Sequence, residues 1–305
     1  MPMSLLVQAG LMQNNMKLSA LAYGKINLYL DVLSRMENGY HNIESVMQSV
    51  SLYDEIHLDI TDIDGENVIE ILSFGGIIPN DKTNLVYKAA VRFLEKANIC
   101  NKKCVFTIVK NIPIAAGMAG GSSDGATALK LLNQAFGAPF SIKELCEIGA
   151  TIGADFPFCL VGGTCICQGI GEKITPLPSL KNVYLICAID DSNVSTPVAF
   201  KMLDDKYGAT PSAYGGLDKI KDAIASGNIF QVSASLYNKF ESIIAPQNPN
   251  IEFIKSTLLE NGALGALMSG SGPSVFGIFD NEKSQINAYE ALKNCSIRAF
   301  LCKTI

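Results

Sequence analysis

The chain has 305 residues and a formal net charge of −5, with 48% hydrophobic and 17% charged residues. This composition excludes an intrinsically disordered chain and predicts one large or two moderate globular domains. The acidic balance argues against nucleic acid as the main partner, because phosphate binding needs clustered Lys and Arg. The absence of any apolar run of about 18 residues predicts that the chain does not span a membrane.

Residues 1–15 differ from the rest of the chain. They carry neither the basic start of a signal peptide nor the Arg-rich bias of a transit peptide. We expect them to form a disordered or dispensable extension, with a docked segment as the alternative. Regular patterning begins at Met16.

Alternating apolar and polar residues predict half-buried strands in the first third of the chain. These segments are residues 26–34 (INLYLDVLS), 55–61 (EIHLDIT), 67–73 (NVIEILS) and 104–110 (CVFTIVK). Residues 84–98 (NLVYKAAVRFLEKAN) have apolar side chains at helical spacing, which predicts an amphipathic helix.

Three later segments carry further signals. Residues 141–153 (SIKELCEIGATIG) open with capping-box spacing and predict a helix. Residues 183–190 (VYLICAID) predict a buried strand. In residues 195–205 (STPVAFKMLDD), the position of Pro197 after Ser and Thr predicts a helix start.

Strands and helices interleave without a steady βαβ rhythm. This pattern favours a mixed α+β architecture over a doubly wound parallel sheet. The turn-rich segment 169–182 (GIGEKITPLPSLKN) is the best candidate for a domain boundary. We therefore predict two domains, residues 16–175 and 176–305.

The nine cysteines are scattered and odd in number, so we expect reduced thiols in a cytoplasmic protein. The pairs Cys100/Cys104 and Cys165/Cys167 have spacings that metal ligands can use. They lie in apolar, strand-like runs, however, and the chain has only two histidines to complete a site. We interpret these cysteines as small buried hydrophobic residues.

Small residues precede a predicted helix in residues 113–133 (PIAAGMAGGSSDGATALKLLN). Glycines permit close backbone approaches that side chains would block, and Ser122 or Ser123 is placed to cap the helix. A helix start of this kind presents unpaired N–H groups and positive potential, which suit a phosphate. The alternative is a tight connection that only serves packing. Neither the Walker-type lysine spacing nor the dinucleotide fingerprint is present.

Three other segments are candidates for function. Residues 266–279 (ALMSGSGPSVFGIF) place a Ser/Gly loop, longer than a hairpin needs, between two apolar strands. Asp155 stands between a predicted helix end and an apolar strand and is a candidate functional carboxylate. The alternative is a carboxylate at a helix end that simply meets solvent. Lys25 and Asn27 alternate on a predicted strand and therefore share one face, although an edge lysine is often simply solvated.

Taken together and in this order, these segments resemble the GHMP kinases. The similar segments are residues 24–56 (N-terminal signature), 113–127 (PIAAGMAGGSSDGAT, the ATP loop), 153–172 (the segment with the catalytic aspartate) and 268–279 (third motif). The likeness runs from about Met16 to the C-terminus. The elements Gly-Tyr-His and Gly-Ala-Asp-x-Pro point to the branch that acts on a cytidine diphosphate derivative of methylerythritol.

The resemblance implies a two-domain GHMP kinase fold, with an N-terminal domain like ribosomal protein S5 domain 2 and a ferredoxin-like α/β sandwich as the C-terminal domain. It implies an enzyme that uses ATP with Mg²⁺ to phosphorylate the 2-hydroxyl of the methylerythritol unit, in non-mevalonate isoprenoid precursor synthesis. Asp155 would accept the proton of the hydroxyl or orient it, and Lys25 would keep Asp155 ionised.

The resemblance also assigns binding residues. The ATP-binding positions are Pro113, Ile114, Ala115, Ala116, Gly117, Met118, Ala119, Gly120, Gly121, Ser122 and Ser123. The substrate-binding positions are Asn27, Tyr40, His41, Thr196 and Phe200, and the third-motif loop consists of Ser269, Gly270, Ser271 and Gly272. Phe200 has core filling as its alternative role. Asp124 would contact Mg²⁺ or favour the helix N-terminus, and we favour the second role.

The sequence departs from the family pattern at Ala115, Ala116 and Ala119, where glycine is frequent, and at Gly24, where alanine is frequent. Because alanine disfavours positive φ angles, we expect right-handed or extended backbone at the three alanines.

Rival interpretations are a GHMP kinase of the mevalonate or homoserine type and a non-catalytic nucleotide-binding sensor on the same scaffold. A dinucleotide-dependent oxidoreductase is the least favoured interpretation, because the glycine-rich fingerprint of dinucleotide-binding proteins is missing. We expect a monomer or weak homodimer.

Overall fold

The computed structural model describes residues 15–189, 195–209 and 213–305. The predicted extension, residues 1–15, lies outside this range except for Asn15. The elements of the first half are β1 (Met16–Arg35), β2 (His41–Asp62), β3 (Val68–Phe74), α1 (Leu85–Lys96), β4 (Lys102–Val109), α2 (Gly120–Ala135), α3 (Ile142–Ala150), α4 (Phe156–Val161), β5 (Thr164–Gly169) and β6 (Lys173–Pro176). The second half contains β7 (Tyr184–Ile189), α5 (Thr196–Tyr207), α6 (Leu217–Ala225), α7 (Ile229–Ser233), β8 (Tyr237–Asn238), α8 (Glu241–Ile244), α9 (Pro249–Glu260), β9 (Gly265–Met268), β10 (Ser274–Phe279), α10 (Glu282–Asn294) and β11 (Arg298–Lys303).

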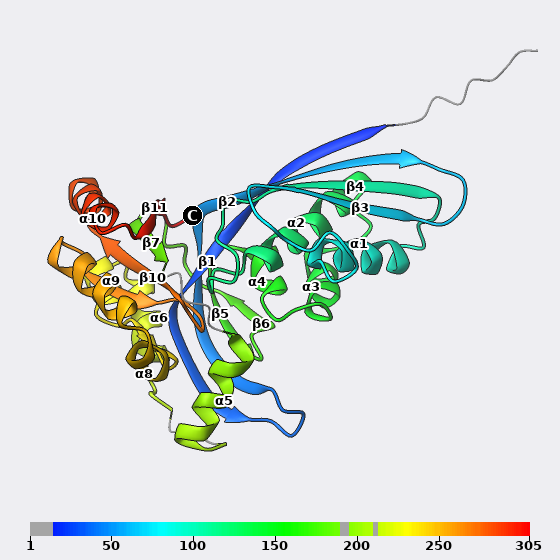
Figure 1. The fold of residues 1–305 in the computed structure, drawn as a ribbon. Coiled ribbons are helices and arrows are strands. Elements are labelled where there is room, and N and C mark those ends of the chain that lie inside the picture. Colours follow the sequence, from blue (N-terminus) through cyan, green and yellow to red (C-terminus); the bar gives the residue numbers. More distant parts are fainter. Residues whose placement is uncertain (1–14, 190–194, 210–212) are drawn as a thin grey trace, which may run out of the picture.

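A seven-stranded sheet carries the first half of the chain, with the order β3-β4-β2-β1-β8 and with β5 and β6 attached through β2. β1 and β2 are antiparallel and pair from Met16↔Ile60 to Arg35↔His41. They run through the whole molecule, with α1 to α4 on one side and the second sheet on the other (Figure 1). Register shifts mark bulges along this pair, which let such long strands bend.

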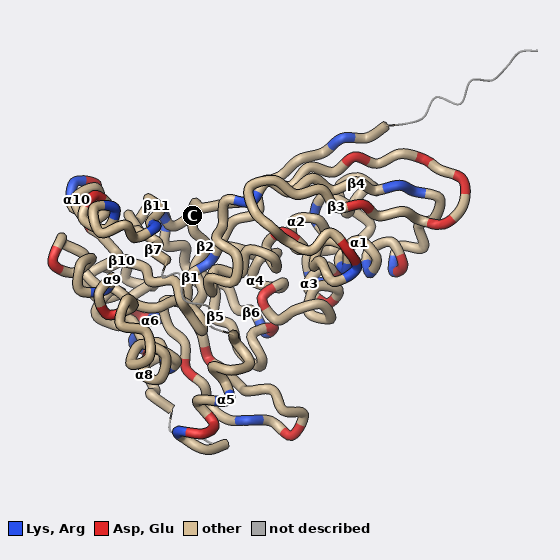
Figure 2. The backbone as a smooth tube through the Cα atoms, viewed as in Figure 1, with Lys and Arg blue, Asp and Glu red and all other residues tan. Residues whose placement is uncertain are grey.

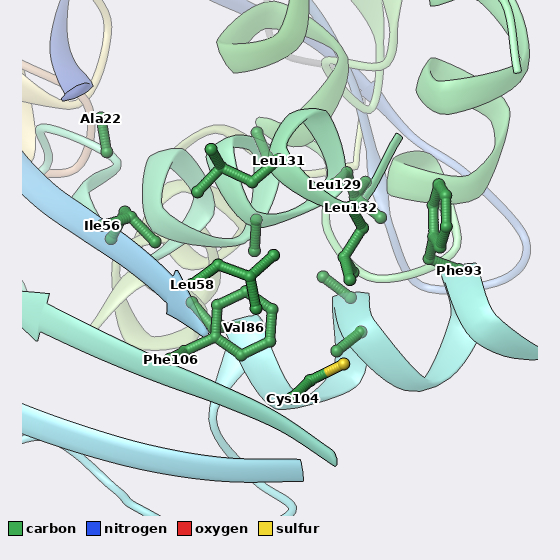
Figure 3. Packing of buried hydrophobic residues seen from close by; sticks show 14 of the residues in the cluster. Ala22, Ile56, Leu58, Val86, Phe93, Cys104, Phe106, Leu129, Leu131 and Leu132 are labelled. Atoms are coloured by element: carbon green, nitrogen blue, oxygen red, sulfur yellow. The ribbon is translucent and has the colours of Figure 1, made fainter. Parts of the chain in front are cut away.

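The first hydrophobic core lies between the large sheet and helices α1 to α4. Leu58 of β2 and Phe106 of β4 pack with Val86 of α1 and Leu129 of α2 in this core (Figure 3). All four side chains are fully buried. Burial of such side chains contributes about 1.5–3 kcal/mol each, so this layer holds α2, and the loop before it, firmly against the sheet.

The second sheet has four antiparallel strands in the order β11-β7-β10-β9. Helices α9 and α10 contact this sheet. A further core cluster contains residues of both sheets, including Leu28 of β1 and Phe276 of β10. The boundary at residues 175–176 falls within β6, and β8 joins the larger sheet, so the division at that point stays a prediction.

Several predictions are confirmed, among them the mixed α+β architecture and the helix over 84–98, which forms α1. The capping box of Ser141 and Glu144 is present, and α3 ends at Ala150, before the predicted Gly153. The apolar strand predicted to follow Asp155 is wrong, because residues 156–161 form the helix α4. A short apolar run fits a buried strand or a buried helix equally well, and proline near the start of α4 favours the helix.

The remaining global features are simple. No helix in the described ranges is long and apolar enough to cross a bilayer. All nine cysteines are free, and the described residues contain no cluster of three or more His, Cys, Asp or Glu side chains that could by itself hold a metal ion. Along the described backbone, Lys and Arg are interspersed with Asp and Glu (Figure 2).

Candidate active site

A cavity of about 1220 Å³ brings together residues from both halves of the chain. The sequence-predicted residues that line it are Lys25, Asn27, Tyr40, His41, Pro113, Ile114, Ala115, Ala116, Gly117, Ala119, Gly120, Gly121, Ser122, Asp124, Asp155, Thr196, Phe200, Gly270, Ser271 and Gly272. Three others, Met118, Ser123 and Ser269, do not line it and are buried. Segments far apart in the sequence therefore meet at one place.

Lys25 ties β1 to the glycine-rich loop. Its Nζ donates hydrogen bonds to Asn27 Oδ1 and to the Gly117 carbonyl, both at 2.8 Å. Its backbone N–H donates to the Met118 carbonyl at 3.1 Å. The side chain is only 4% exposed, so the alternative of a solvated edge lysine is excluded.

The third-motif loop packs directly on the glycine-rich loop. The Ser269 hydroxyl donates to the Gly117 carbonyl and accepts from the Asn27 N–H, both at 3.3 Å. A Cβ atom on Gly117 would lie 2.4 Å from the Ser269 carbonyl oxygen. Small residues are therefore required here because two backbones touch.

The backbone of the glycine-rich loop contradicts one expectation. Ala115 and Ala119 have φ angles of 57° and 56°, in the left-handed region that we expected alanine to avoid. Local preference is overridden here by the tertiary contacts that hold the loop between β1 and the third-motif loop. Of the three alanines, only Ala116 does not have a positive φ angle, as expected.

The start of α2 also differs from the prediction that Ser122 or Ser123 caps it. Helix α2 begins at Gly120, its N-cap residue is Ala119, and no side chain caps it. Ser123 lies inside the helix, where its hydroxyl donates to the Tyr23 carbonyl at 2.7 Å. The uncapped first turn leaves backbone N–H groups available at the cavity, as an anion site requires.

The left-handed alanine permits a prediction. Ala119→Gly should leave the free energy of unfolding unchanged or higher, because relief of about 1 kcal/mol of strain offsets the entropy of glycine. The control Ala128→Gly, inside α2, should lower it by about 1 kcal/mol or more. Urea denaturation measures both, and equal destabilisation by the two variants would contradict the left-handed assignment.

Asp155 is the N-cap residue of α4, but its side chain makes no capping hydrogen bond. Within the described residues its carboxylate has no ion pair, so it does not contact Lys25 directly, and the expectation that Lys25 keeps it ionised stays a prediction. Asp155 and Lys25 still both act on the Cys159 thiol. Burial raises the pKa of this thiol, the charge of Asp155 raises it further, and the charge of Lys25 opposes the rise. The carboxylate is thus free to accept a proton or a hydrogen bond in the cavity.

A buried ion cluster beside the loop was missed by the sequence analysis, except for Asp124. Lys110 Nζ, at the end of β4, pairs with Asp54 and, at 2.7 Å, with Asp124 Oδ2. The other oxygen of Asp54 accepts from the backbone N–H groups of Asn111 and Ile112 at 2.6 and 2.8 Å. The cluster fixes the strand end that leads into the loop. A lysine at a strand end carries no sequence signal for such pairing.

Asp124 keeps one oxygen free. Its Oδ1 atom is buried without a hydrogen-bond partner, and the residue lines the cavity. Burial raises the pKa of Asp124 to about 7; Lys110 opposes this rise and Asp54 adds to it. The position of the Asp124 carboxylate is therefore determined by its ion pair with Lys110, and not by the helix N-terminus alone.

A further part of the cavity lining is aromatic. His41 is buried and stacks on Phe200, with ring centroids 4.4 Å apart and an interplanar angle of 18°. Phe200 also meets Phe240 edge-on and packs against a core cluster, so its core-filling role is real as well. Tyr40, next to His41, is 60% exposed. The hydroxyls of Thr196 and Ser271 share a hydrogen bond of 2.9 Å.

The fold and the site define a class of protein. The family profile of the GHMP kinases N terminal domain matches residues 84–163, and that of the GHMP kinases C terminal domain matches residues 217–297. The chain belongs to the GHMP kinase family and has its two-domain fold of mixed helices and sheets.

Within the GHMP kinase family, the chain is similar to several named kinases. The 4-diphosphocytidyl-2-C-methyl-D-erythritol kinase of Clostridium kluyveri is 43% identical over 286 residues, which is 93% of this chain and 99% of that protein. That of Clostridium tetani is 42% identical over 284 residues, with the same coverage. A crystal structure of 4-(cytidine 5'-diphospho)-2C-methyl-D-erythritol kinase matches with a TM-score of 0.77 and 28% identity over 94% of this chain and 99% of that one. The homoserine kinase of Cytophaga hutchinsonii, at 18% identity and a TM-score of 0.72 over 96% of this chain and 95% of that one, shares the fold.

Proposed function

We propose that the protein transfers the γ-phosphate of ATP to the 2-hydroxyl of 4-(cytidine 5'-diphospho)-2-C-methyl-D-erythritol, giving the 2-phosphate and ADP in non-mevalonate isoprenoid precursor synthesis. Relatives with this activity in their names are 39–43% identical over most of the chain. The observation that carries the proposal is the meeting of Lys25, Asp155 and two small-residue loops in one cavity.

Phosphoryl transfer depends mainly on positioning and on charge neutralisation. The uncapped start of α2 and the glycine-rich loop offer backbone N–H groups to the phosphates of ATP. Lys25 has three N–H donors and uses two on Asn27 and Gly117, so the third is available to a phosphate oxygen. Asp155, which has a free carboxylate, accepts the proton of the attacking hydroxyl or orients that hydroxyl.

The residues present also fit Mg²⁺. The unpartnered Oδ1 of Asp124 and the hydroxyl of Ser122, both from α2 residues that line the cavity, are the kind of oxygen that Mg²⁺ prefers. These two residues would hold the ion together with phosphate oxygens. Bound there, the ion would neutralise charge on the phosphates.

A pH dependence follows from the raised pKa of Asp124, about 7. A protonated carboxyl is a poor metal ligand, so the affinity for Mg²⁺-ATP should increase as the pH rises through about 7. For stability the sign is opposite: the folded state holds a proton that the unfolded chain releases, so the free energy of unfolding falls between about pH 4 and 7. Calorimetric titration with Mg²⁺-ATP at several pH values measures the affinity. Asp124→Asn should flatten the profile, and an equally steep profile in that variant would refute the role of Asp124.

Tyr40→Ala should raise KM for the cytidine substrate about tenfold and change kcat little, because an aromatic face contributes binding by stacking. Tyr40 is exposed at the cavity mouth, so its loss leaves the fold intact. Tyr23→Ala, on β1 and outside the cavity, is the control. Steady-state kinetics measures both variants, and a lost kcat with unchanged KM in Tyr40→Ala would contradict the assignment.

A coupled assay of ADP release tests the activity itself. The cytidine substrate should support turnover, whereas mevalonate, homoserine and galactose should not. Turnover with one of these three would favour another GHMP kinase activity, and ATP binding without any transfer would favour a nucleotide sensor. The proposal places the enzyme in the cytoplasm as a monomer or weak homodimer.

A further inference from the structure

A carboxylate on α5 holds His41 in the aromatic part of the cavity lining. His41 Nε2 and Asp204 Oδ1 lie 2.8 Å apart in a hydrogen bond, and Asp204 Oδ2 lies 3.4 Å from Arg35 Nη1. Arg35 ends β1 and His41 begins β2, so both partners flank the hairpin tip that carries Tyr40. Asp204 thus joins α5 to both strands at once.

The orientation of the His41 ring is fixed at two points. The stack on Phe200 sets the plane of the ring, and Asp204 holds the edge that carries Nε2. A flip of the ring would break the hydrogen bond to Asp204. The other nitrogen, Nδ1, has no hydrogen-bond partner in residues 15–189, 195–209 and 213–305, and His41 lines the cavity. Nδ1 is therefore the polar atom that His41 can offer to a ligand.

The chemistry of Asp204 decides what Nδ1 can do. An ionised carboxylate only accepts hydrogen bonds, so Nε2 must carry the proton. In the neutral imidazole, Nδ1 is then a lone-pair acceptor. Arg35 also contacts Asp204, on the oxygen that does not bind His41, and so helps to hold the carboxylate in place. Asp204 thereby sets the tautomer of His41.

We propose that Asp204 is a positioning residue that makes His41 an acceptor and so selects cytosine over uracil in the substrate. This inference rests on the proposed function. Cytosine presents an amino donor at C4, whereas uracil presents a carbonyl acceptor at the same position. A uracil would place two acceptors opposite each other, and a site built to pair with a donor rejects a ligand that lacks it. Because the ring is already fixed, little conformational entropy of His41 is lost when the substrate binds.

The first test compares kcat/KM for the cytidine substrate and its uridine analogue. Asp204→Asn can donate to Nε2 and thus shift the ring proton to Nδ1, so the cytidine preference should fall about tenfold or more. KM for ATP and the melting temperature should stay near the wild-type values, which a general structural defect would not allow. Asp204→Glu keeps the carboxylate and should restore part of the preference. Asp222→Asn, an exposed carboxylate on α6 outside the cavity, is the control and should leave the preference unchanged.

The second test observes the tautomer directly and needs no variant of Asp204. The chain has only two histidines, so ¹⁵N NMR of the His57→Gln protein reports His41 alone. We expect protonated Nε2 and unprotonated Nδ1, with a mixture in Asp204→Asn. A proton on Nδ1 in the otherwise wild-type protein would overturn the inference. If Asp204→Asn does not fold, this spectrum and the Asp204→Glu kinetics decide.

The outcomes separate the two levels of the proposal. A wild-type enzyme that phosphorylates neither the cytidine nor the uridine substrate overturns the proposed function. A wild-type enzyme that prefers the cytidine substrate, together with an Asp204→Asn variant that keeps the full preference, overturns only the role of Asp204.

Discussion

Asp155→Asn is expected to lower kcat by a factor of about 100 or more while KM for ATP stays near the wild-type value. The amide keeps the shape of the side chain but cannot accept a proton. The Asp155 carboxylate has no hydrogen-bond or ion-pair partner among the described residues, so its replacement leaves no other group unpaired. It also lies outside the glycine-rich loop, so the binding of ATP should be unaffected.

Steady-state kinetics of the purified variant measures both parameters. Asp280→Asn, an exposed carboxylate two residues before α10 and outside the cavity, is a suitable control and should behave as the wild type. An Asp155→Asn enzyme that keeps more than about a tenth of the wild-type kcat would show that Asp155 only orients the hydroxyl.

Gly117→Ala is expected to raise KM for ATP at least about tenfold and to lower the melting temperature by several degrees. Gly117 has a φ angle of 73°, and its new Cβ would lie 2.4 Å from the Ser269 carbonyl oxygen and 3.2 Å from that of Gly272. These are backbone atoms and cannot rotate away, so the two loops must separate. Their separation would also disturb Lys25, which donates to the Gly117 carbonyl.

Gly137→Ala is the matched control for this prediction. Gly137 has a φ angle of 78°, but an added Cβ would meet no atom within 4 Å. This variant carries only the backbone strain of about 1–2 kcal/mol and should keep a wild-type KM for ATP. If both variants lose stability equally and neither loses ATP affinity, the contact between the two loops has no role in binding.

The parts of the site that lie within continuous motifs could be predicted from sequence. Lys25 and Asn27 share a strand face because alternation is a local property, and the structure joins them by a hydrogen bond. The glycine-rich loop was located because small residues before a helix are also a local signal. The meeting of Lys25 and Asp155 in one cavity, by contrast, was predicted only through the family resemblance.

Features that depend on long-range contacts could not be predicted. The left-handed backbone of Ala119 opposes the local preference of alanine and exists because neighbouring segments hold the loop. The pairing of Lys110 with Asp54 and Asp124 joins three separate elements. Asp204 meets His41 across 163 positions of the chain, and a lone aspartate on a helix carries no signal for that.

The most direct measurement of the central claim is ³¹P NMR of the wild-type protein with ATP, Mg²⁺ and the cytidine substrate. If the cavity aligns the γ-phosphate with the hydroxyl near Asp155 and Lys25, one new phosphomonoester at the 2-position should appear for each ADP formed. ADP accompanied by inorganic phosphate alone, or an ester at another hydroxyl, would contradict the account.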